Sequence, residues 1–300
     1  AGSVLSGGFL AGGCLSGGAL PLGRTAKDSI GVPMEGLRFS LKIGMVQPGE
    51  TLADKFRLLQ EIGYDGVELD SPNEYANEDV LAALKSAPGF KIPGVVDSKH
   101  WQWTLGDADA DVRRQGREAL ETALRDAKAY GASSVLLVPG VVDAARSYAD
   151  VYRRSQEEIR KVVPLAEKLG VDIAFENVWN QFLLSPLEAA RYVDEFESER
   201  VGWYFDIGNL VNTGYPDQWI RTLGPRIKKL DVKDYSRKKR DEEGLWKGFA
   251  CKIGDGDADW PRVRGALTEI GYSGWASAEV AGGDEERLAE ILERMRSNLL

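Results

Sequence analysis

The 300-residue sequence contains only one histidine, His100, and two cysteines, Cys14 and Cys251. A single histidine excludes the zinc centres that use several histidines. The two cysteines lie far apart in the sequence, so neither a clustered thiolate metal site nor a disulfide framework is expected. A Ser-His-Asp hydrolase could use only His100, and the sequence has no G-x-S-x-G motif to supply its serine.

Basic residues are in the minority. Lys and Arg number 38 against 47 Asp and Glu, which gives a formal net charge of -9. Because a nucleic-acid backbone is bound by a basic face, no nucleic-acid partner is expected. The strongest basic run, Arg237 to Arg240, is followed at once by Asp241, Glu242 and Glu243, and we interpret it as a solvated loop.

The sequence begins with a stretch that carries no charge before Arg24 and is rich in Gly, Ala, Ser and Leu. Short apolar stretches of small residues are typical of the end of an export signal, and LAGGC loosely resembles a lipoprotein cleavage site. We expect residues 1–38 to be a flexible leader left from such a signal, on a bacterial protein that is periplasmic or lipid-anchored. A disordered leader on a cytoplasmic protein is the alternative. The stretch is too short and glycine-rich for a good transmembrane helix.

From residue 39 onward, short apolar runs alternate with amphipathic segments. Apolar spacings of three and four residues predict helices, and glycines at positions 63, 131, 170 and 271 are placed as helix C-caps. Eight strands are predicted, at 39–47, 65–70, 91–98, 133–140, 171–178, 201–209, 227–234 and 274–280. Their strict alternation with eight helices predicts an α/β protein, a single (β/α)8 TIM barrel over residues 39–300.

An open doubly wound sheet is the alternative fold, but the first strand is followed by QPGET, which is no phosphate-binding loop. The longest connection runs from Tyr235 to Asp259. Because it follows a strand of a barrel, we expect it to lie on the catalytic face as a lid or a subunit contact.

Four acidic residues each end an apolar run, in VDIAFE, VGWYFD, IKKLD and GWASAE: Glu176, Asp206, Asp231 and Glu279. A carboxylate that has lost water is unfavourable unless a partner compensates it. Since the carboxyl ends of barrel strands converge on one mouth, the four acids are expected to share a divalent cation. An all-oxygen set suits Mn²⁺, Mg²⁺ or Co²⁺ better than a structural zinc. Each acid taken alone could instead be a helix cap or a salt-bridge partner.

Three long segments carry a resemblance to a known family: ENVWNQFLLSPLEAARYVDEF, YFDIGNLVNTGYPDQWIRTLGPRIKKLDVKDY and GDGDADWPRVRGALTEIGYSGWASAE. They are similar to the sugar isomerase/epimerase superfamily with the xylose isomerase-like barrel, which includes ketose 3-epimerases and hexulose-phosphate epimerases. The resemblance implies a metal site, most simply for Mn²⁺, formed by Glu176, Asp206, Asp231 and Glu279. The family usually has a histidine where this sequence has Asp231. The additional negative charge favours hard cations over Zn²⁺.

The resemblance also implies a sugar isomerase or epimerase that moves a proton next to a carbonyl through an enediolate, with Glu176 and Glu279 as the two bases. It further implies a homo-oligomer, a dimer or a tetramer. Two alternatives stay open. One is a metal-dependent lyase or dehydratase acting on a keto-sugar or keto-glycoside, and the other is a non-catalytic sugar-binding barrel.

Several residues near the predicted strand ends are candidate sugar contacts. Aromatic rings there can pack on the C–H face of a sugar, and polar groups can bind its hydroxyls. We expect Glu68 to end the second strand and bind a hydroxyl, and Lys233 to be either an oxyanion donor or part of a barrel salt bridge. The segment NVWNQFLL lacks the Arg and Glu with which ketose 3-epimerases grip a free ketose. The full set of candidates is Glu68, His100, Trp101, Trp179, Asn180, Asn209 and Lys233.

Overall fold

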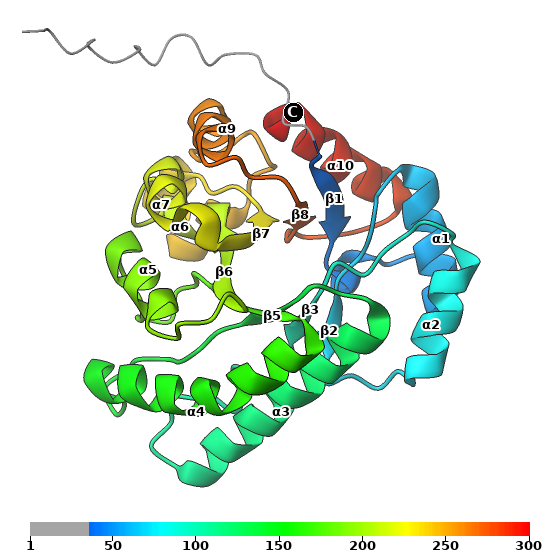
Figure 1. Ribbon diagram of the computed structural model, residues 1–300. Helices are drawn as coiled ribbons and strands as arrows, with labels where there is room; N and C mark the ends of the chain where they lie inside the picture. Colours follow the sequence, from blue (N-terminus) through cyan, green and yellow to red (C-terminus); the bar gives the residue numbers. More distant parts are fainter. Residues whose placement is uncertain (1–35) are drawn as a thin grey trace, which may run out of the picture. The chain divides into compact units, whose positions relative to one another are not determined.

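Eight parallel strands surrounded by helices make up the computed structural model, which describes residues 36–300 (Figure 1). The predicted (β/α)8 architecture is therefore confirmed. The predicted leader falls almost wholly in residues 1–35, outside the described residues, and stays a prediction together with export. The first strand begins at Arg38. Every described helix is too short or too polar to cross a membrane.

The strands are β1 (Arg38–Leu41), β2 (Leu69–Ser71), β3 (Gly94–Asp97), β4 (Ser134–Leu137), β5 (Asp172–Glu176), β6 (Val201–Asp206), β7 (Ile227–Val232) and β8 (Trp275–Ala278). The helices are α1 (Leu52–Ile62), α2 (Asn77–Ser86), α3 (Ala110–Tyr130), α4 (Tyr148–Leu169), α5 (Pro186–Asp194), α6 (Ile207–Val211), α7 (Pro216–Leu223), α8 (Arg237–Glu243), α9 (Trp260–Glu269) and α10 (Glu285–Leu299). Short 3₁₀ turns are η1 (Ile43–Met45), η2 (Gly224–Arg226) and η3 (Leu245–Phe249). The four glycines predicted to end helices all have positive φ, from 67° to 107°.

The strand order is β1-β8-β7-β6-β5-β4-β3-β2, so β1 and β2 stand at its two ends. Backbone hydrogen bonds join these ends, from Glu68 N to Leu41 O (2.8 Å) and from Ile43 N to Glu68 O (2.9 Å). The ring of strands is closed by these bonds. The prediction that Glu68 ends the second strand is wrong, because Glu68 directly precedes β2 and closes the barrel by bridging to Lys42.

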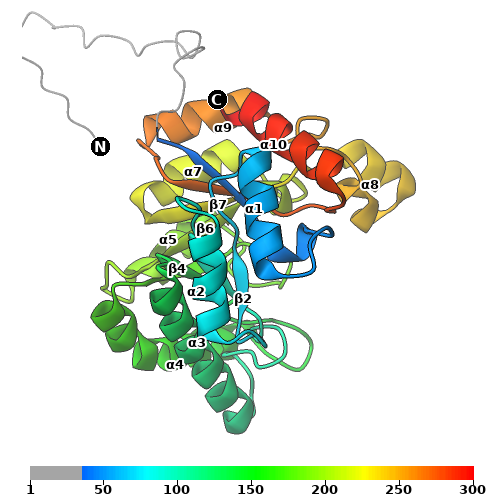
Figure 2. The ribbon, with the colours of Figure 1, turned by 90° about the vertical axis from the view of Figure 1, so that its right-hand side faces the viewer.

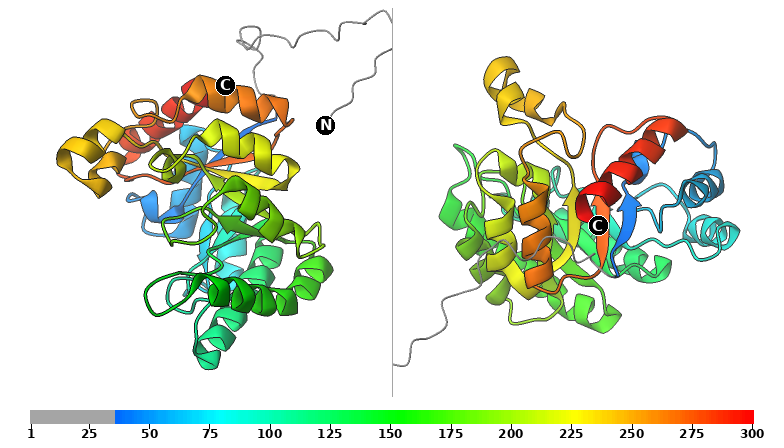
Figure 3. Two further views of the ribbon diagram at one scale, coloured as in Figure 1. Left: turned by 90° about the vertical axis from the view of Figure 1, so that its left-hand side faces the viewer. Right: turned by 90° about the horizontal axis from the view of Figure 1, so that it is seen from above.

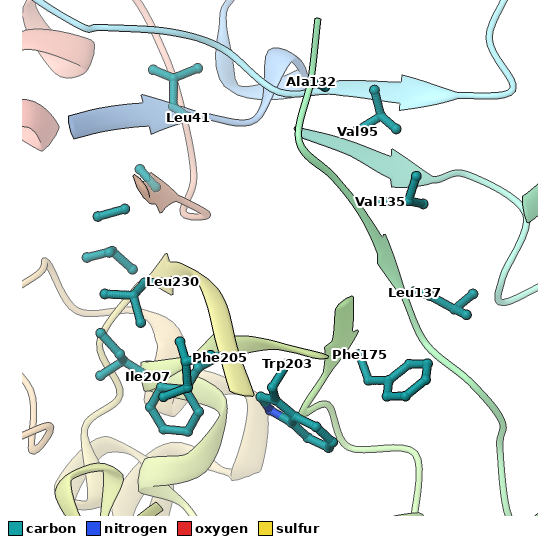
Figure 4. Close-up of a cluster of buried hydrophobic side chains, with 14 of the residues drawn as sticks. Leu41, Val95, Ala132, Val135, Leu137, Phe175, Trp203, Phe205, Ile207 and Leu230 are labelled. Carbon is teal, nitrogen blue, oxygen red and sulfur yellow. The ribbon is translucent and has the colours of Figure 1, made fainter. Parts of the chain in front are cut away.

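Residues along each strand alternate between the outer and inner faces of the barrel. The outward residues are large and apolar and form the main core beneath the helices; Figure 4 shows Leu41, Val135, Phe175 and Trp203 among them. The inward residues form a second, smaller cluster of Leu136, Ala174 and Tyr204, with Val96 against it. Because side chains on one face of a strand recur every second residue, Glu176 follows Ala174 and Asp206 follows Tyr204 on this inner face. The barrel strands themselves therefore position these two carboxylates.

Residues 235–259, here called the β7–β8 arm, form the long connection after β7. Figures 2 and 3 show α8 and η3 standing out from the barrel. The prediction of a solvated loop at Arg237 to Arg240 is wrong, since these residues lie in α8, where the Ser236 side chain caps the helix by accepting from Lys239 N. A run of charged residues is compatible with either a loop or a short capped helix, and composition alone does not separate the two.

Candidate active site

The four predicted acids meet at the carboxyl ends of β5 to β8. Each of Glu176, Asp206, Asp231 and Glu279 offers one carboxylate oxygen, and these oxygens all lie within 4.8 Å of one another. The first three side chains are buried and the fourth is partly exposed. Their convergence follows from the alternation of the strands. Each acid stands two residues beyond an inward position, and the carboxyl ends of all eight strands open at one mouth.

Three oxygens of this cluster are buried and accept no hydrogen bond. Asp206 Oδ2 and both side-chain oxygens of Asp231 accept no hydrogen bond from any described residue. Buried polar groups are ordinarily hydrogen-bonded, so orphaned carboxylate oxygens that face one another indicate a missing positive partner. The donor set is all oxygen, which is the set that hard divalent cations prefer. The residues present therefore fit a divalent cation.

Two lysines enter the cluster. Lys233 Nζ lies 2.9 Å from Asp206 Oδ2 and also pairs with Glu279, so it takes the salt-bridge role that was one of its two expected roles. Lys42 Nζ lies 2.9 Å from Asp231 Oδ1. The contacts to Asp206 and Asp231 are ion pairs and not hydrogen bonds, and Asp231 Oδ2 has neither.

Sequence reasoning missed Lys42. It ends the run FSLK in the same way as the four acids end theirs, and it lies on the inward face two residues after Ser40. The position of Lys42 at the end of an apolar run is therefore a signal that the sequence contains. Lys42 also donates to Glu68 Oε2 (2.6 Å), and Tyr204 O–H donates to Glu68 Oε1 (2.6 Å). With both oxygens engaged and 1% of its surface exposed, Glu68 supports Lys42 from inside the barrel and does not face the mouth.

The pKa values of the four acids are shifted in different directions. Burial, with the charge of Glu279 next to it, holds the pKa of Glu176 well above its usual range. Burial raises the pKa of Asp231 as well, against the opposing charge of Lys42, and it raises the pKa of Asp206 to about 6. For Glu279 burial also acts upward, but Lys233 and Lys42 outweigh it and the pKa is lowered. Four carboxylates this close cannot all ionise at ordinary cost without more positive charge.

Asparagines hold two of the acids in place. Asn177 Oδ1 accepts from Asp206 N (3.0 Å) and Asn177 Nδ2 donates to Asp206 O (2.7 Å), which fixes the end of β6 against β5. Asn209 N donates to Asp206 Oδ1 (2.6 Å) and Asn209 Nδ2 to Glu176 Oε1 (3.3 Å). Asn209, a predicted sugar contact, is thus engaged with two candidate ligands. Asn177 was not singled out from the sequence, although it directly follows Glu176.

The mouth of the barrel contains two adjoining hollows that share Glu279, Val280 and Ala281. One, of about 390 Å³, is also lined by Asn209, Lys233, Asp234, Trp246 and Phe249. The other, of about 420 Å³, is also lined by Lys42, Gly44, Met45, Asp70, Val96 and Gly282. A larger hollow of about 640 Å³ lies around the amino ends of β6 and β7, away from all four acids. The chemistry of the side chains, and not the size of the hollow, marks the mouth as the candidate site.

Aromatic side chains cover one side of the mouth. The Trp179 ring lies 4.9 Å from that of Trp246 and 5.0 Å from that of Phe249, centroid to centroid. Trp179 Nε1–H donates to Asn209 O (2.7 Å), which fixes the indole next to the acids. Trp179 is half-buried beneath this group, whereas Trp246 and Phe249 line the hollow itself.

The remaining predicted contacts differ in placement. His100 Nδ1 accepts from Val138 N (3.3 Å), and the His100 ring meets Trp101 edge-on at 5.5 Å. Burial lowers the pKa of His100 to about 4, while the nearby charge of Glu279 acts in the opposite direction. Trp101 is exposed.

Asn180 Nδ2 donates to Gly140 O (2.8 Å) and its Oδ1 accepts from Phe182 N (3.3 Å), so the buried side chain joins two loops, and its sugar contact stays a prediction.

Asp234 is a second residue that sequence reasoning missed. Its carboxylate accepts hydrogen bonds from the backbone of Tyr235, Gly254, Gly256 and Ala258 and from the indole of Trp260, at 2.8 to 3.2 Å. One buried side chain at the end of β7 thus fastens both ends of the β7–β8 arm. The DVKD segment contains it, but the sequence gives no sign of which of its aspartates faces the loop.

Comparisons with known proteins agree with the fold. The chain matches the family described as xylose isomerase-like TIM barrel over residues 56–298. The L-ribulose-5-phosphate 3-epimerase of Shigella flexneri is 27% identical over 237 residues, which cover 75% of this chain and 81% of that protein. Among solved structures, the 3-keto-D-glucoside 4-epimerase of E. coli is 17% identical with a TM-score of 0.70, over 87% of this chain and 98% of that one. The IolI protein with a bound zinc atom is 16% identical with a TM-score of 0.69, over the same shares of the two chains.

Proposed function

Because this chain belongs to the xylose isomerase-like TIM barrel family, we propose that it is a divalent-metal-dependent sugar epimerase or isomerase. The observation that carries the proposal is the set of four carboxylates with oxygens that lie within 4.8 Å of one another; three oxygens of this set are buried and accept no hydrogen bond from the described residues. The similarity to an L-ribulose-5-phosphate 3-epimerase supports the same reaction class. The reaction would move a proton on the carbon next to a carbonyl group, through an enediolate.

Glu176, Asp206, Asp231 and Glu279 would hold the cation, and four carboxylates suit Mn²⁺ best, with Mg²⁺ or Co²⁺ as alternatives. When bound, a divalent cation polarises a carbonyl oxygen and stabilises the negative charge that develops there. Asp231 in place of a neutral ligand favours a hard cation over zinc. The zinc of the IolI structure belongs to that protein and does not decide the ion here.

Glu176 and Glu279 are the proposed proton-transfer pair. Glu176 ends β5 and Glu279 directly follows β8, and these strands are separated in the ring by β6 and β7, so the two carboxylates would approach a bound sugar from different sides. Glu279 lines both hollows, and Asn209 orients Glu176. Removal of a proton on one side and its return on the other inverts one stereocentre. Lys233, paired with Asp206 and Glu279, keeps the latter carboxylate turned into the mouth.

Hydrogen exchange in heavy water tests the proposal. The Mn²⁺-loaded protein is incubated with ketoses, sugar phosphates and keto-glycosides in D₂O, and the products are followed by NMR. An epimerase or isomerase returns a sugar that carries deuterium next to its carbonyl, whereas a lyase or dehydratase releases a group. We expect Glu176→Gln and Glu279→Gln to lower the exchange rate by roughly 10²- to 10⁴-fold. Unchanged exchange in both variants contradicts the two-carboxylate mechanism.

A further inference from the structure

Trp246 in the β7–β8 arm exposes 70% of its surface, although it lines the hollow beside Glu279. Large exposed apolar side chains next to a cavity mark places where a ligand or a partner binds. The chemistry at the acids does not use this tryptophan. Figure 2 shows that the arm that carries it stands out from the barrel.

The indole of Trp246 rests on a fixed support. Its ring centroid lies 4.9 Å from that of Trp179, at an interplanar angle of 42°. Trp179 is in turn held by the hydrogen bond from its Nε1–H to Asn209 O, and Asn209 contacts Glu176 and Asp206. The exposed aromatic surface is therefore tied through two side chains to the candidate catalytic acids. An aromatic face of this kind packs well on the C–H face of a sugar ring.

The charges of the mouth argue against a phosphate group there. Among the described residues that line the two hollows, the cations are Lys42 and Lys233. Both are already paired with buried carboxylates. Phosphate binding uses free Arg or Lys side chains or the amino end of a helix. The other charged lining residues are acids, Asp70, Asp234 and Glu279, which repel a phosphate.

We propose that the hollow between Glu279 and Trp246 is a second sugar subsite, and that the substrate is an uncharged glycoside or disaccharide. Its reacting ring lies at the four acids and its second ring packs on Trp246 and Phe249. This inference rests on the proposed function. The hollow of about 390 Å³ falls within the size range of small-molecule sites, roughly 300–1,000 Å³. A second copy of the chain that covers the exposed arm is the competing occupant, and the test separates the two.

Three ligands that differ at one oxygen provide the test. D-fructose, isomaltulose and D-fructose 6-phosphate share the ketose, and they carry at O6 a proton, a glucose ring or a phosphate. Lactulose and turanose extend the series to other attachment points of the second ring. Binding to the full-length, Mn²⁺-loaded protein is measured by titration calorimetry. We expect at least one of the three disaccharides to bind roughly tenfold tighter than D-fructose, and D-fructose 6-phosphate to bind no tighter than D-fructose.

The matched variants are Trp246→Ala and Leu245→Ala. Leu245 is the neighbouring exposed apolar residue in η3 but does not line the hollow. Trp246→Ala is expected to remove the preference for the disaccharide, and Leu245→Ala to preserve it. If both substitutions instead lower the oligomeric state, as measured by light scattering, and neither changes sugar binding, then the arm is an interface between copies and the subsite is overturned.

The remaining outcomes decide between the subsite and the proposed function. The subsite is overturned if no disaccharide binds more tightly than D-fructose, or if D-fructose 6-phosphate binds the tightest. If sugars exchange deuterium but Trp246→Ala does not change disaccharide binding, the proposed function is supported and the subsite is contradicted. If Trp246→Ala weakens disaccharide binding but no sugar exchanges deuterium, the subsite is supported and the epimerase function is contradicted. The two proposals therefore fail separately.

Discussion

Lys42 Nζ lies between two buried carboxylates from different parts of the barrel, 2.9 Å from Asp231 Oδ1 and 2.6 Å from Glu68 Oε2. Asp231 stands where the family that the sequence resembles usually has a histidine. A carboxylate paired with an ammonium group has the same net charge as a neutral ligand. Because Lys42 shares its one positive charge between Glu68 and Asp231, it offsets part of the negative charge that Asp231 adds to the candidate metal site. Lys42 and Asp231 are therefore best regarded as one unit.

Loss of Lys42 is expected to destabilise the barrel strongly. Lys42→Met leaves Glu68 and Asp231 buried without their shared cation, and breaking a buried pair in this way costs about 3–5 kcal/mol. The free energy of unfolding, measured in urea, should fall by that amount. Lys42→Arg keeps the charge and should lose clearly less. Equal stability of wild type and Lys42→Met would show that the ion pairs of Lys42 with Glu68 and Asp231 do not stabilise the fold.

Lys42 and Asp231 should also be coupled in metal binding. Asp231→His alone leaves Lys42 facing a site with one negative charge fewer, and Mn²⁺ binding should weaken. Combined with Lys42→Met, the histidine restores the original charge balance, so affinity should recover. Calorimetric titration of the four proteins forms a double-mutant cycle, in which the expected coupling is about 1–3 kcal/mol. Strictly additive effects contradict the view that the pair acts as a unit.

The purified protein should contain close to one Mn, Mg or Co ion per chain. Asp231→Ala and Glu279→Ala each remove a candidate ligand, and both should reduce the metal content measured by mass spectrometry after incubation with Mn²⁺ and desalting. Asp70→Asn is the control, because Asp70 is an acid of the same mouth that lies outside the cluster of four. A wild-type protein that binds no metal in excess Mn²⁺ excludes the proposed metal centre.

The only histidine of the sequence should make stability depend on pH. Burial lowers the pKa of His100 to about 4, below the value of about 6.5 for an unfolded chain. Between these two values the unfolded state binds more protons than the folded state, so this contribution to stability is complete above pH 6.5 and is lost as the pH falls toward 4. The difference between these two pKa values limits this loss to roughly 3–4 kcal/mol.

His100→Gln isolates this effect. The variant should lose less stability than the wild type on acidification from pH 7 to pH 4, as measured by urea unfolding at each pH. Asp97, whose pKa burial raises to about 7, titrates in the same window with the opposite sign, but it is present in both proteins and cancels in the comparison. Parallel pH profiles for the two proteins would rule out a buried, neutral His100.

Asp234 should govern the order of the β7–β8 arm. Asp234→Ala removes five hydrogen bonds and leaves several backbone N–H groups without their acceptor, so amide exchange in residues 235–259 should become faster. The strands should exchange as before. Hydrogen-exchange mass spectrometry reads both regions in one experiment. Asp234→Asn keeps one acceptor oxygen and should show an intermediate effect, and no change in the arm for either variant contradicts the role.

The cluster of acids was predictable because topology alone brings it together. Glu176, Asp206, Asp231 and Glu279 each end an apolar run, and parallel barrel strands share one mouth. No knowledge of side-chain conformation was needed. The closure of the barrel at Glu68 was not predictable in the same way, because its partner Lys42 lies 26 residues away and the run DGVELD gives no sign of where its pairing begins.

The polar contacts around the acids show where sequence reasoning ends. Trp179, Asn180 and Asn209 are all predicted to lie near strand ends, yet Asn180 binds backbone groups of its own loop and of the loop at Gly140, and Asn209 binds the acids. Which of several polar residues in a loop turns inward depends on the backbone conformation of that loop. Gln181 and Leu183, close to Asn180, have positive φ values that no sequence pattern announces.

Both ends of the β7–β8 arm are tied to one carboxylate at the end of β7, while the four acids stand on the strands. The segment that carries Trp246 is therefore attached to the barrel through its two ends. Its length and composition could change without displacing the four acids. Under the two proposals made above, the residues that recognise the second sugar ring and the residues that carry the chemistry lie on different pieces of this chain. A graft of residues 235–259 onto another barrel of the family would carry the recognition surface with it and leave the chemistry of the recipient intact.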